Sequence, residues 1–204
     1  LLSIRRQRRM CIRDSHRSEH DQALNAMRRN IDAWWPAIEA GAEAIIMTAS
    51  GCGAMVQEYG HLLKDDPTYA AKAQKVSDMT VDLGAFLLKQ DLEKLKVPQG
   101  AGKVAFHCPC TLQHAMQQNG VVDQVLRRAG IDLAETKEKH LCCGSAGTYS
   151  ILQPKLSQRL LNNKLKALTV DNPDRIVTAN IGCQMHLETK AQVPVQHWIE
   201  LLDA

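Results

Sequence analysis

A nine-residue pattern occurs twice in this sequence of 204 residues and constrains its fold more than any other feature. Residues 44–52 (AIIMTASGC) and 175–183 (RIVTANIGC) both run from an apolar stretch through Thr-Ala and a short loop to Gly-Cys. Each apolar stretch is typical of a short buried strand, and helical periodicity flanks it. Because strands that alternate with helices favour a mainly parallel sheet with flanking helices, we predict an α/β protein with two similar units.

The periodicity of the apolar residues predicts further elements on either side of each repeat. In the first half we expect a helix interrupted at Pro36, a strand at 44–48, and helices at 54–63 and 72–89. In the second half the predicted strands are 103–107, 175–179 and 193–195, with helical segments between them and at the C-terminus. Pro154 is suited to the first turn of a long helix. Its expected apolar face comprises Leu156, Leu160, Leu161, Leu165 and Leu168.

Charge and hydropathy exclude several classes of function. The net charge is +3, but six arginines fall within residues 1–20, so residues 21–204 carry no basic excess and nucleic acid is not an expected partner. No apolar run is long enough to span a bilayer, and the arginine-rich start lacks the apolar core of a secretory signal. We therefore expect a cytoplasmic protein, in which clustered cysteines hold metal more often than they form disulfides.

Four of the seven cysteines form an ordered pattern in the second half of the chain. Cys110 is separated by 31 residues from Cys142-Cys143-Gly144, and a further 38 residues separate this triplet from Cys183. Cys110 and Cys183 each follow a predicted strand, and the carboxyl ends of neighbouring parallel strands share one edge of a sheet. Iron–sulfur clusters require several thiolates at one point, and glycine allows the backbone to approach closely. The pattern therefore indicates an iron–sulfur site.

These residues resemble the cysteine-rich CCG domain family, which is written Cys, Cys-Cys-Gly, Cys-x-x-Cys. The segments HCPCTLQHA, HLCCGSAGTY, NIDAWWPAIEAGAEAI and TANIGCQMHL are most similar to the iron–sulfur subunits of glycolate oxidases, from about residue 19 to the C-terminus. The resemblance implies two CCG units, of which the first is truncated here. It also implies an iron–sulfur cluster of the 4Fe–4S type, with Cys110, Cys142, Cys143 and Cys183 as ligands and Gly144 beside them.

The same resemblance implies a function in electron transfer. Such a subunit passes electrons from flavin-containing subunits, which oxidise glycolate or another 2-hydroxy acid, to a quinone or another acceptor. The flavin would lie on the partner subunits, and we identify no catalytic acid or base in this chain. Contact with the quinone pool would place the protein peripherally at the cytoplasmic face of the inner membrane. The equivalent subunits of lactate-utilisation and heterodisulfide-reductase complexes remain alternatives.

The chain departs from the family pattern at several positions. The closing Cys-x-x-Cys is Cys183-x-x-His186, so a fifth ligand would come from His186 or Cys108. Cys52 is the repeat counterpart of Cys183, but its own Cys-Cys-Gly would fall near residue 12, where only Cys11 is found. We therefore expect a fragment. Its predicted organisation is a disordered or non-native tail at 1–18, the C-terminal half of a first CCG unit at 19–90, a linker at 91–101 and a complete second unit at 102–204.

Two other interpretations of the cysteines stay open. A structural zinc module for subunit assembly could use Cys110, Cys142, Cys183 and His186 as four tetrahedral ligands. A thiol–disulfide relay between Cys142 and Cys143 would require a strained ring and is less favoured. We expect His107 and His114 to serve as hydrogen-bonding or structural residues, and Trp34 and Trp35 to lie in a core or a subunit interface.

Overall fold

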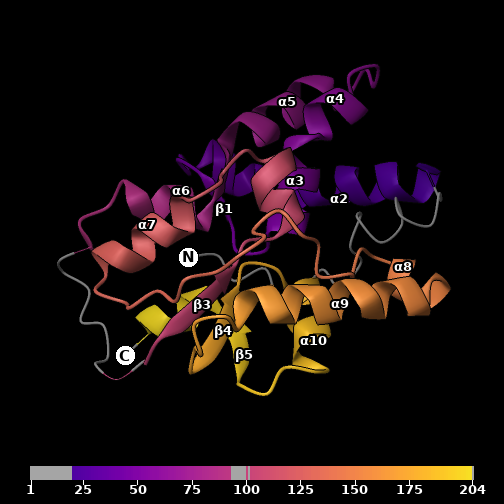
Figure 1. Ribbon diagram of the computed structural model, residues 1–204. Coiled ribbons are helices and arrows are strands. Elements are labelled where there is room, and N and C mark those ends of the chain that lie inside the picture. Colours follow the sequence, from indigo (N-terminus) through magenta and orange to yellow (C-terminus); the bar gives the residue numbers. More distant parts are fainter. Residues whose placement is uncertain (1–19, 93–99, 101, 204) are drawn as a thin grey trace. The chain divides into compact units, whose positions relative to one another are not determined.

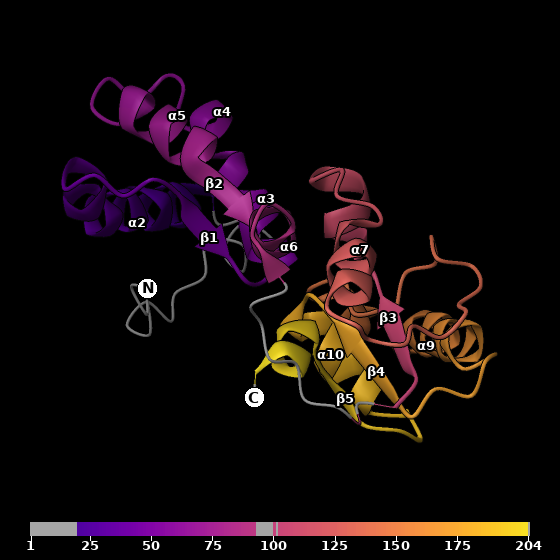
Figure 2. The ribbon, with the colours of Figure 1, turned by 90° about the vertical axis from the view of Figure 1, so that its left-hand side faces the viewer.

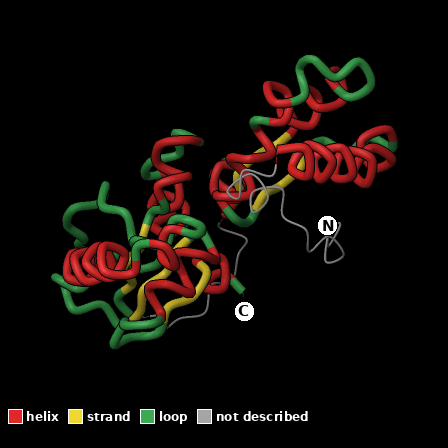
Figure 3. The backbone as a smooth tube through the Cα atoms, turned by 90° about the vertical axis from the view of Figure 1, so that its right-hand side faces the viewer, coloured by secondary structure: helices red, strands yellow, loops and turns green. Residues whose placement is uncertain are grey.

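The computed structural model describes residues 20–92, 100 and 102–203, and this part of the chain divides into two compact units. The N-terminal unit comprises residues up to Met47 together with Gly51–Val81, and the C-terminal unit comprises Thr48–Ser50 and Asp82 onward. Helices and strands occur in both units (Figure 1, Figure 3). The predicted tail at 1–18 and most of the predicted linker at 91–101 lie outside the described residues.

The N-terminal unit consists mainly of helices around a two-stranded sheet in which β1 pairs with β2. Its core is formed by apolar side chains of α2, α4 and α5, including Ile31, Tyr59 and Val76. An ion pair between Arg28 and Asp66 adds a polar contact at its margin. Its elements are α2 (His20–Glu39), β1 (Ile45–Met47), α3 (Ser50–Gln57), α4 (Tyr59–Leu62), α5 (Ala70–Met79) and β2 (Thr80–Asp82).

Two of the predictions for this region were wrong. The helix expected over 72–89 is interrupted, because α5 ends at Met79 and β2 follows before a new helix begins at Leu83. The helical spacing of apolar residues continues through β2, but the pairing of β2 with β1 makes these residues a strand and overrides the local preference for a helix. The helix does not restart at Pro36, since α2 continues through this residue to Glu39.

The C-terminal unit is built on a parallel sheet with the strand order β3-β4-β5. Helix α9 contacts β3, and α10 contacts β4 and β5 (Figure 2). The elements are α6 (Leu83–Leu88), β3 (Val104–His107), the π-helix η2 (Thr111–Ala115), α7 (Val121–Arg128), α8 (Tyr149–Leu152), α9 (Pro154–Leu168), β4 (Arg175–Thr178), α10 (Ile181–Glu188), β5 (Val195–His197) and the 3₁₀ helix η3 (Trp198–Leu202). The fold is therefore of the predicted α/β class.

The strand register determines which side chains face α9 and α10. Ala105, Ile176 and Val195 form one row across the three strands and pack in a core cluster with Leu161 of α9 and Leu187 of α10. Side chains two residues apart on a strand point to the same face. His107 is two residues beyond Ala105 and pairs with Thr178. It therefore lies on the α9 and α10 side of the sheet, at its carboxyl edge.

The second half of the chain also differs from the prediction in detail. The helix expected from Cys110 to Gly130 is divided into η2 and α7, and the last strand begins at Val195 rather than Val193. Pro154 opens α9 as predicted, but the buried face of this helix is rotated from the predicted one. Leu156 is 45% exposed, and the residues that α9 buries are Ser157, Leu161, Lys164, Ala167 and Leu168.

Among the described residues, none of the helices combines the length and the apolar character needed to cross a bilayer.

Candidate metal centre

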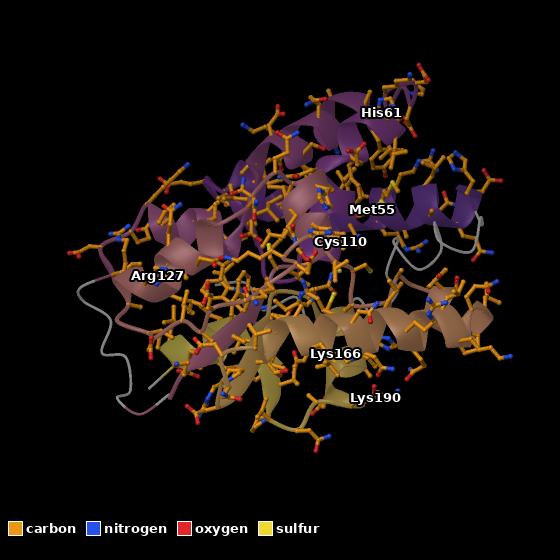
Figure 4. All side chains as sticks on the ribbon, viewed as in Figure 1. Met55, His61, Cys110, Arg127, Lys166 and Lys190 are labelled. Carbon is orange, nitrogen blue, oxygen red and sulfur yellow. The ribbon has the colours of Figure 1, made fainter. Side chains whose placement is uncertain are left out.

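The carboxyl edge of the β3-β4-β5 sheet brings together the cysteines of the sequence pattern. Strand β3 ends at His107 and leads to Cys110 at the start of η2, and β4 ends at Thr178, shortly before Cys183 in the first turn of α10. Figure 4 labels Cys110 beyond the carboxyl end of β3. The loop with Cys142 and Cys143 precedes α8 and α9. Cys183 was expected in a loop, and its place inside a helix is a small correction.

The four cysteines form a continuous series of side-chain contacts. Cys110 hydrogen-bonds to Cys142, Cys142 to Cys143, and Cys143 to Cys183. The sulfur atoms of Cys143 and Cys183 and a ring nitrogen of His107 all lie within 4.8 Å of one another. None of these cysteines, nor Cys108, is in a disulfide. The residues predicted as ligands thus meet at one place, and their coordination of a metal remains a prediction.

The thiols differ sharply in acidity within this series. Hydrogen bonds from Cys110 and Cys143 hold the pKa of Cys142 far below its ordinary value, and a hydrogen bond from Cys143 lowers the pKa of Cys183. Accordingly, the contact with Cys142 raises the pKa of both Cys110 and Cys143, and burial adds to the effect. The contacts thus favour the thiolate forms of Cys142 and Cys183 and the protonated forms of Cys110 and Cys143. Because metals bind thiolates, a bound cation would take the place of these protons.

The glycine of the triplet is required by the path of the backbone. Gly144 has φ of +94°, and a Cβ built there would lie 2.5 Å from the carbonyl oxygen of Ser157 on α9. The amide of Gly144 donates to the sulfur of Cys142 at 3.3 Å, and the Ser157 hydroxyl donates to the carbonyl oxygen of Gly144 at 2.8 Å. The glycine thus lets the loop press against α9 and directs a backbone N–H at a sulfur.

The start of α10 favours a thiolate at Cys183. The side chain of Asn180 caps the helix by accepting from the amide of Gly182 at 2.9 Å. Cys183 then lies in the first turn, where the partial positive charge of a helix N-terminus stabilises an anion. A Cβ at Gly182 would lie 3.2 Å from the hydroxyl oxygen of Ser145, so α10 approaches the Cys-Cys-Gly loop closely.

The two candidates for a fifth ligand are not directed at the cysteine series. The Nε2 atom of His186 lies 3.1 Å from the hydroxyl of Ser157, the residue that also donates to Gly144. Cys108 is buried, and burial raises its pKa to about 12, with Asp123 of α7 as the next cause. Neither residue is among the donors that lie within 4.8 Å of one another at Cys143 and Cys183. The geometry therefore suits His186 for supporting the loop and Cys108 for local packing.

His107 was not among the predicted ligands, and the structure places it in the centre of the site. Its side chain is 1% exposed, and neither ring nitrogen has a well-formed hydrogen bond within the described part of the chain. Its hydrogen-bonding partner is the Cys183 sulfur, whose pKa this contact lowers, so a hydrogen-bonding role for His107 stays a prediction, while His114 is exposed on η2. His107 ends β3 and directly precedes Cys108-Pro109-Cys110, and this place in the sequence contains no signal for its orientation. A buried polar group left unpaired costs about 1–3 kcal/mol.

Lys164 is a second residue that sequence reasoning missed. It is 1% exposed on α9, and its ammonium group donates to the carbonyl oxygens of Glu138 and Lys139. Burial lowers its pKa, and the four cysteines Cys110, Cys108, Cys143 and Cys142 act in the opposite direction. Gln113 joins the same region by donating to the carbonyl oxygens of Cys108 and Lys139. A buried cation thus accompanies the thiolates.

Cys52 belongs to the N-terminal unit, where it is the third residue of α3. Its place in the helix matches that of Cys183 in α10, as the repeat predicted. Cys11 and the position expected for a first Cys-Cys-Gly lie outside the described residues.

The donor set of the C-terminal unit fits an iron–sulfur cluster. Clusters are held mainly by thiolates and accept an imidazole in some proteins. Here Cys110, Cys142, Cys143 and Cys183 form a continuous series of contacts, and a ring nitrogen of His107 lies within 4.8 Å of the last two sulfurs. A backbone N–H and a buried lysine lie beside them.

Sequence comparison identifies a family and several relatives. The family model of the cysteine-rich domain, CCG, matches residues 12–57 and 104–188. The glycolate oxidase iron-sulfur subunit of Escherichia coli (strain K12) is 54% identical over 190 residues, which are 93% of this chain and 46% of that protein. The probable glycolate oxidase iron-sulfur subunit of Bacillus subtilis (strain 168) is 32% identical over 178 residues, 85% of this chain and 39% of its own length.

A third relative is lactate utilization protein A of Bacillus licheniformis, which is 29% identical over 192 residues, 88% of this chain and 76% of that protein. The chain spans less than half the length of the two glycolate oxidase relatives. The first family match covers residues 12–57 and begins before residue 19, where the resemblance was expected to start.

Proposed function

This chain belongs to the cysteine-rich CCG domain family, and from that premise we propose that it is an iron–sulfur electron-transfer part of a complex that oxidises glycolate or a related 2-hydroxy acid. The names of its relatives, glycolate oxidase iron-sulfur subunit and lactate utilization protein A, support this class of complex. The first of these relatives favours glycolate, because its identity to this chain is 54%.

The observation that carries the proposal is the convergence of Cys110, Cys142, Cys143 and Cys183 at one edge of a parallel sheet. We propose these four as ligands of a cluster, of the 4Fe–4S type, which would supply one-electron transfer when bound. The chain buries Cys143 and directs the amide of Gly144 at the sulfur of Cys142. Such contacts adjust the potential of a metal site.

In the proposed complex, flavin-containing subunits oxidise the hydroxy acid and a quinone or another acceptor receives the electrons. This division of labour is what the family resemblance implies, since cofactors carry hydride chemistry and the cysteine site of this chain would carry electrons. The protein would then work in the cytoplasm, at the inner face of the membrane that holds the quinone pool. The first CCG unit would be represented by residues 19–90, and residues 102–204 would form the complete second unit.

Structural zinc binding is a second candidate, favoured by one specific observation. His107, Cys143 and Cys183 offer one nitrogen and two sulfurs within 4.8 Å, which is a donor set typical of zinc. Zinc would stabilise the carboxyl edge of the sheet and have no redox function.

Anaerobic reconstitution with iron and sulfide separates the two candidates. We expect the chain to bind iron and acid-labile sulfide in comparable amounts, to gain sulfur-to-iron charge-transfer absorption, and to show a paramagnetic signal in one oxidation state. A soluble quinone should then reoxidise the reduced protein. About one equivalent of zinc after anaerobic isolation, without uptake of iron and sulfide, would contradict the electron-transfer proposal and support the zinc module.

A further inference from the structure

His107 occupies the position in which a further ligand of the cysteine site would have to lie. The sequence ends its motif with Cys183-x-x-His186, so the second cysteine of the family's closing pair is replaced. His186 does not compensate for this replacement, because its Nε2 atom lies 3.1 Å from the hydroxyl of Ser157. A ring nitrogen of His107, in contrast, lies within 4.8 Å of the sulfurs of both Cys143 and Cys183.

The surroundings of His107 explain its orientation. It is the last residue of β3 and pairs with Thr178 on β4, in the row that faces α9 and α10. Cys183 begins α10 and Cys143 lies in the core cluster against α9, so both sulfurs approach from the same face of the sheet. Cys108 follows directly in the chain but is not among the donors that lie within 4.8 Å of one another.

The hydrogen bonding of His107 points to a ligand rather than to packing. A buried imidazole normally donates from one nitrogen and accepts at the other. The ring of His107 is 1% exposed, and apart from the contact with the Cys183 sulfur that lowers the pKa of that thiol, neither nitrogen has a hydrogen bond within the described part of the chain. The neighbours it does have are sulfur atoms of residues that we propose as metal ligands. A coordinate bond to a metal would satisfy the nitrogen that faces them.

We propose that the imidazole of His107 is a direct ligand of the metal centre, as the non-thiolate donor beside Cys143 and Cys183. The inference rests on the proposed function, since it assigns a ligand to the same cluster. It distinguishes this chain from a centre held by thiolates alone, and replacing a thiolate by a neutral imidazole raises the potential of an iron–sulfur centre.

Variants of the full chain test this assignment. His107→Gln removes the imidazole, and His114→Gln is the matched control, because His114 is exposed on η2. His107→Cys keeps a donor at the position, and His186→Gln tests the rival histidine. Circular dichroism and urea unfolding establish whether each variant is folded. If His107→Gln does not fold, His107→Cys still tests the assignment.

Two measurements give separate outcomes for the ligand and for the cluster. With cobalt(II) alone, we expect His107→Gln to weaken binding by at least about tenfold, while His114→Gln and His186→Gln stay within about twofold of the parent. In the reconstituted protein, pulsed electron paramagnetic resonance with ¹⁵N-labelled histidine should detect a directly coupled nitrogen. This coupling should be lost in His107→Gln and in His107→Cys, and His107→Cys should gain sulfur-to-cobalt absorption.

A reconstituted parent with no coupled histidine nitrogen, or a coupling that survives in His107→Gln or His107→Cys, would overturn the assignment and leave the proposed function intact. Failure of the parent to take up iron and sulfide would instead refute the proposed function. In that case the cobalt titration still decides whether His107 binds a metal, and unchanged cobalt affinity in His107→Gln would refute the ligand as well.

Discussion

Cys52 and Cys183 occupy the same place in two copies of one local motif, yet their surroundings differ. Each is the third residue of a helix that follows a short strand. In the C-terminal unit the helix meets a Cys-Cys-Gly loop and the end of β3, so Cys183 contacts Cys143 and His107. In the N-terminal unit the segment that would supply the corresponding loop lies outside the described residues. The comparison teaches that the strand–loop–helix motif positions a single thiol, and that a site requires further loops from the same sheet edge.

Replacement of Cys143 should give the largest difference in metal content between a variant of the C-terminal unit and a matched variant of the N-terminal unit. Cys143→Ser removes the sulfur that contacts both Cys142 and Cys183, so we expect reconstituted protein to lose nearly all bound iron and sulfide. Cys52→Ser is the matched control in the N-terminal unit and should retain the metal content of the parent. Iron and sulfide analysis measures both, and an equal loss in Cys52→Ser would remove the distinction between the units.

Two glycines with the same backbone angle allow the loop to be compared with a turn in the other unit. Gly144 and Gly41 both have φ of +94°, but a Cβ would meet Ser157 at Gly144 and nothing within 4 Å at Gly41. We expect Gly41→Ala to lower the free energy of unfolding by about 1 kcal/mol, because of the backbone angle alone. Gly144→Ala should cost about 3 kcal/mol, since overpacking is added. Urea unfolding at neutral pH measures both, and similar costs would show that α9 does not constrain the loop.

The buried ammonium group is a feature of the C-terminal unit that can be removed by one substitution. Lys164→Met deletes a buried amino group that interacts with the cysteines, so we expect the potential of a bound cluster to become more negative. Lys166→Met is the control, because Lys166 is exposed two residues further along α9 (Figure 4). Redox titration of the reconstituted protein measures both, and an unchanged potential in Lys164→Met would limit this lysine to binding the carbonyl oxygens of Glu138 and Lys139.

The smallest effect concerns the ion pair of the N-terminal unit. Partial burial alone raises the pKa of Asp66, but hydrogen bonds from the Thr68 and Tyr69 amides and from Arg28 outweigh it and lower the pKa. A lowered carboxyl pKa stabilises the folded state above the unfolded value of 3.8, and this stability is lost as the pH falls through the folded pKa. The parent should therefore exceed Asp66→Asn in stability at pH 7 and approach it below pH 3.8. Urea unfolding across this range measures the difference, and a gap that persists in acid would contradict the linkage.

Much of the fold could be predicted because its local signals agree with its tertiary contacts. The strands that became β3 and β4 are short buried runs that end at cysteine-containing loops, and Pro154 marks the start of α9. Strand β2 was missed because three residues are too few to show a period of two, while helical spacing continues from Val76 to Leu87 across it. The buried face of α9 was misassigned because Lys164 replaces an apolar residue at a position that faces the site.

The sequence by itself determined the α/β class, the repeat, the family and the four cysteines that meet, because these depend on residue type and spacing along the chain. Only the tertiary structure showed that His107, rather than Cys108 or His186, is the further donor within 4.8 Å of Cys143 and Cys183. The parallel pairing of β3 with β4 brings His107 and Cys183 to one edge of the sheet. That choice depends on register and on the packing of α9 and α10, which spacing in a sequence does not contain.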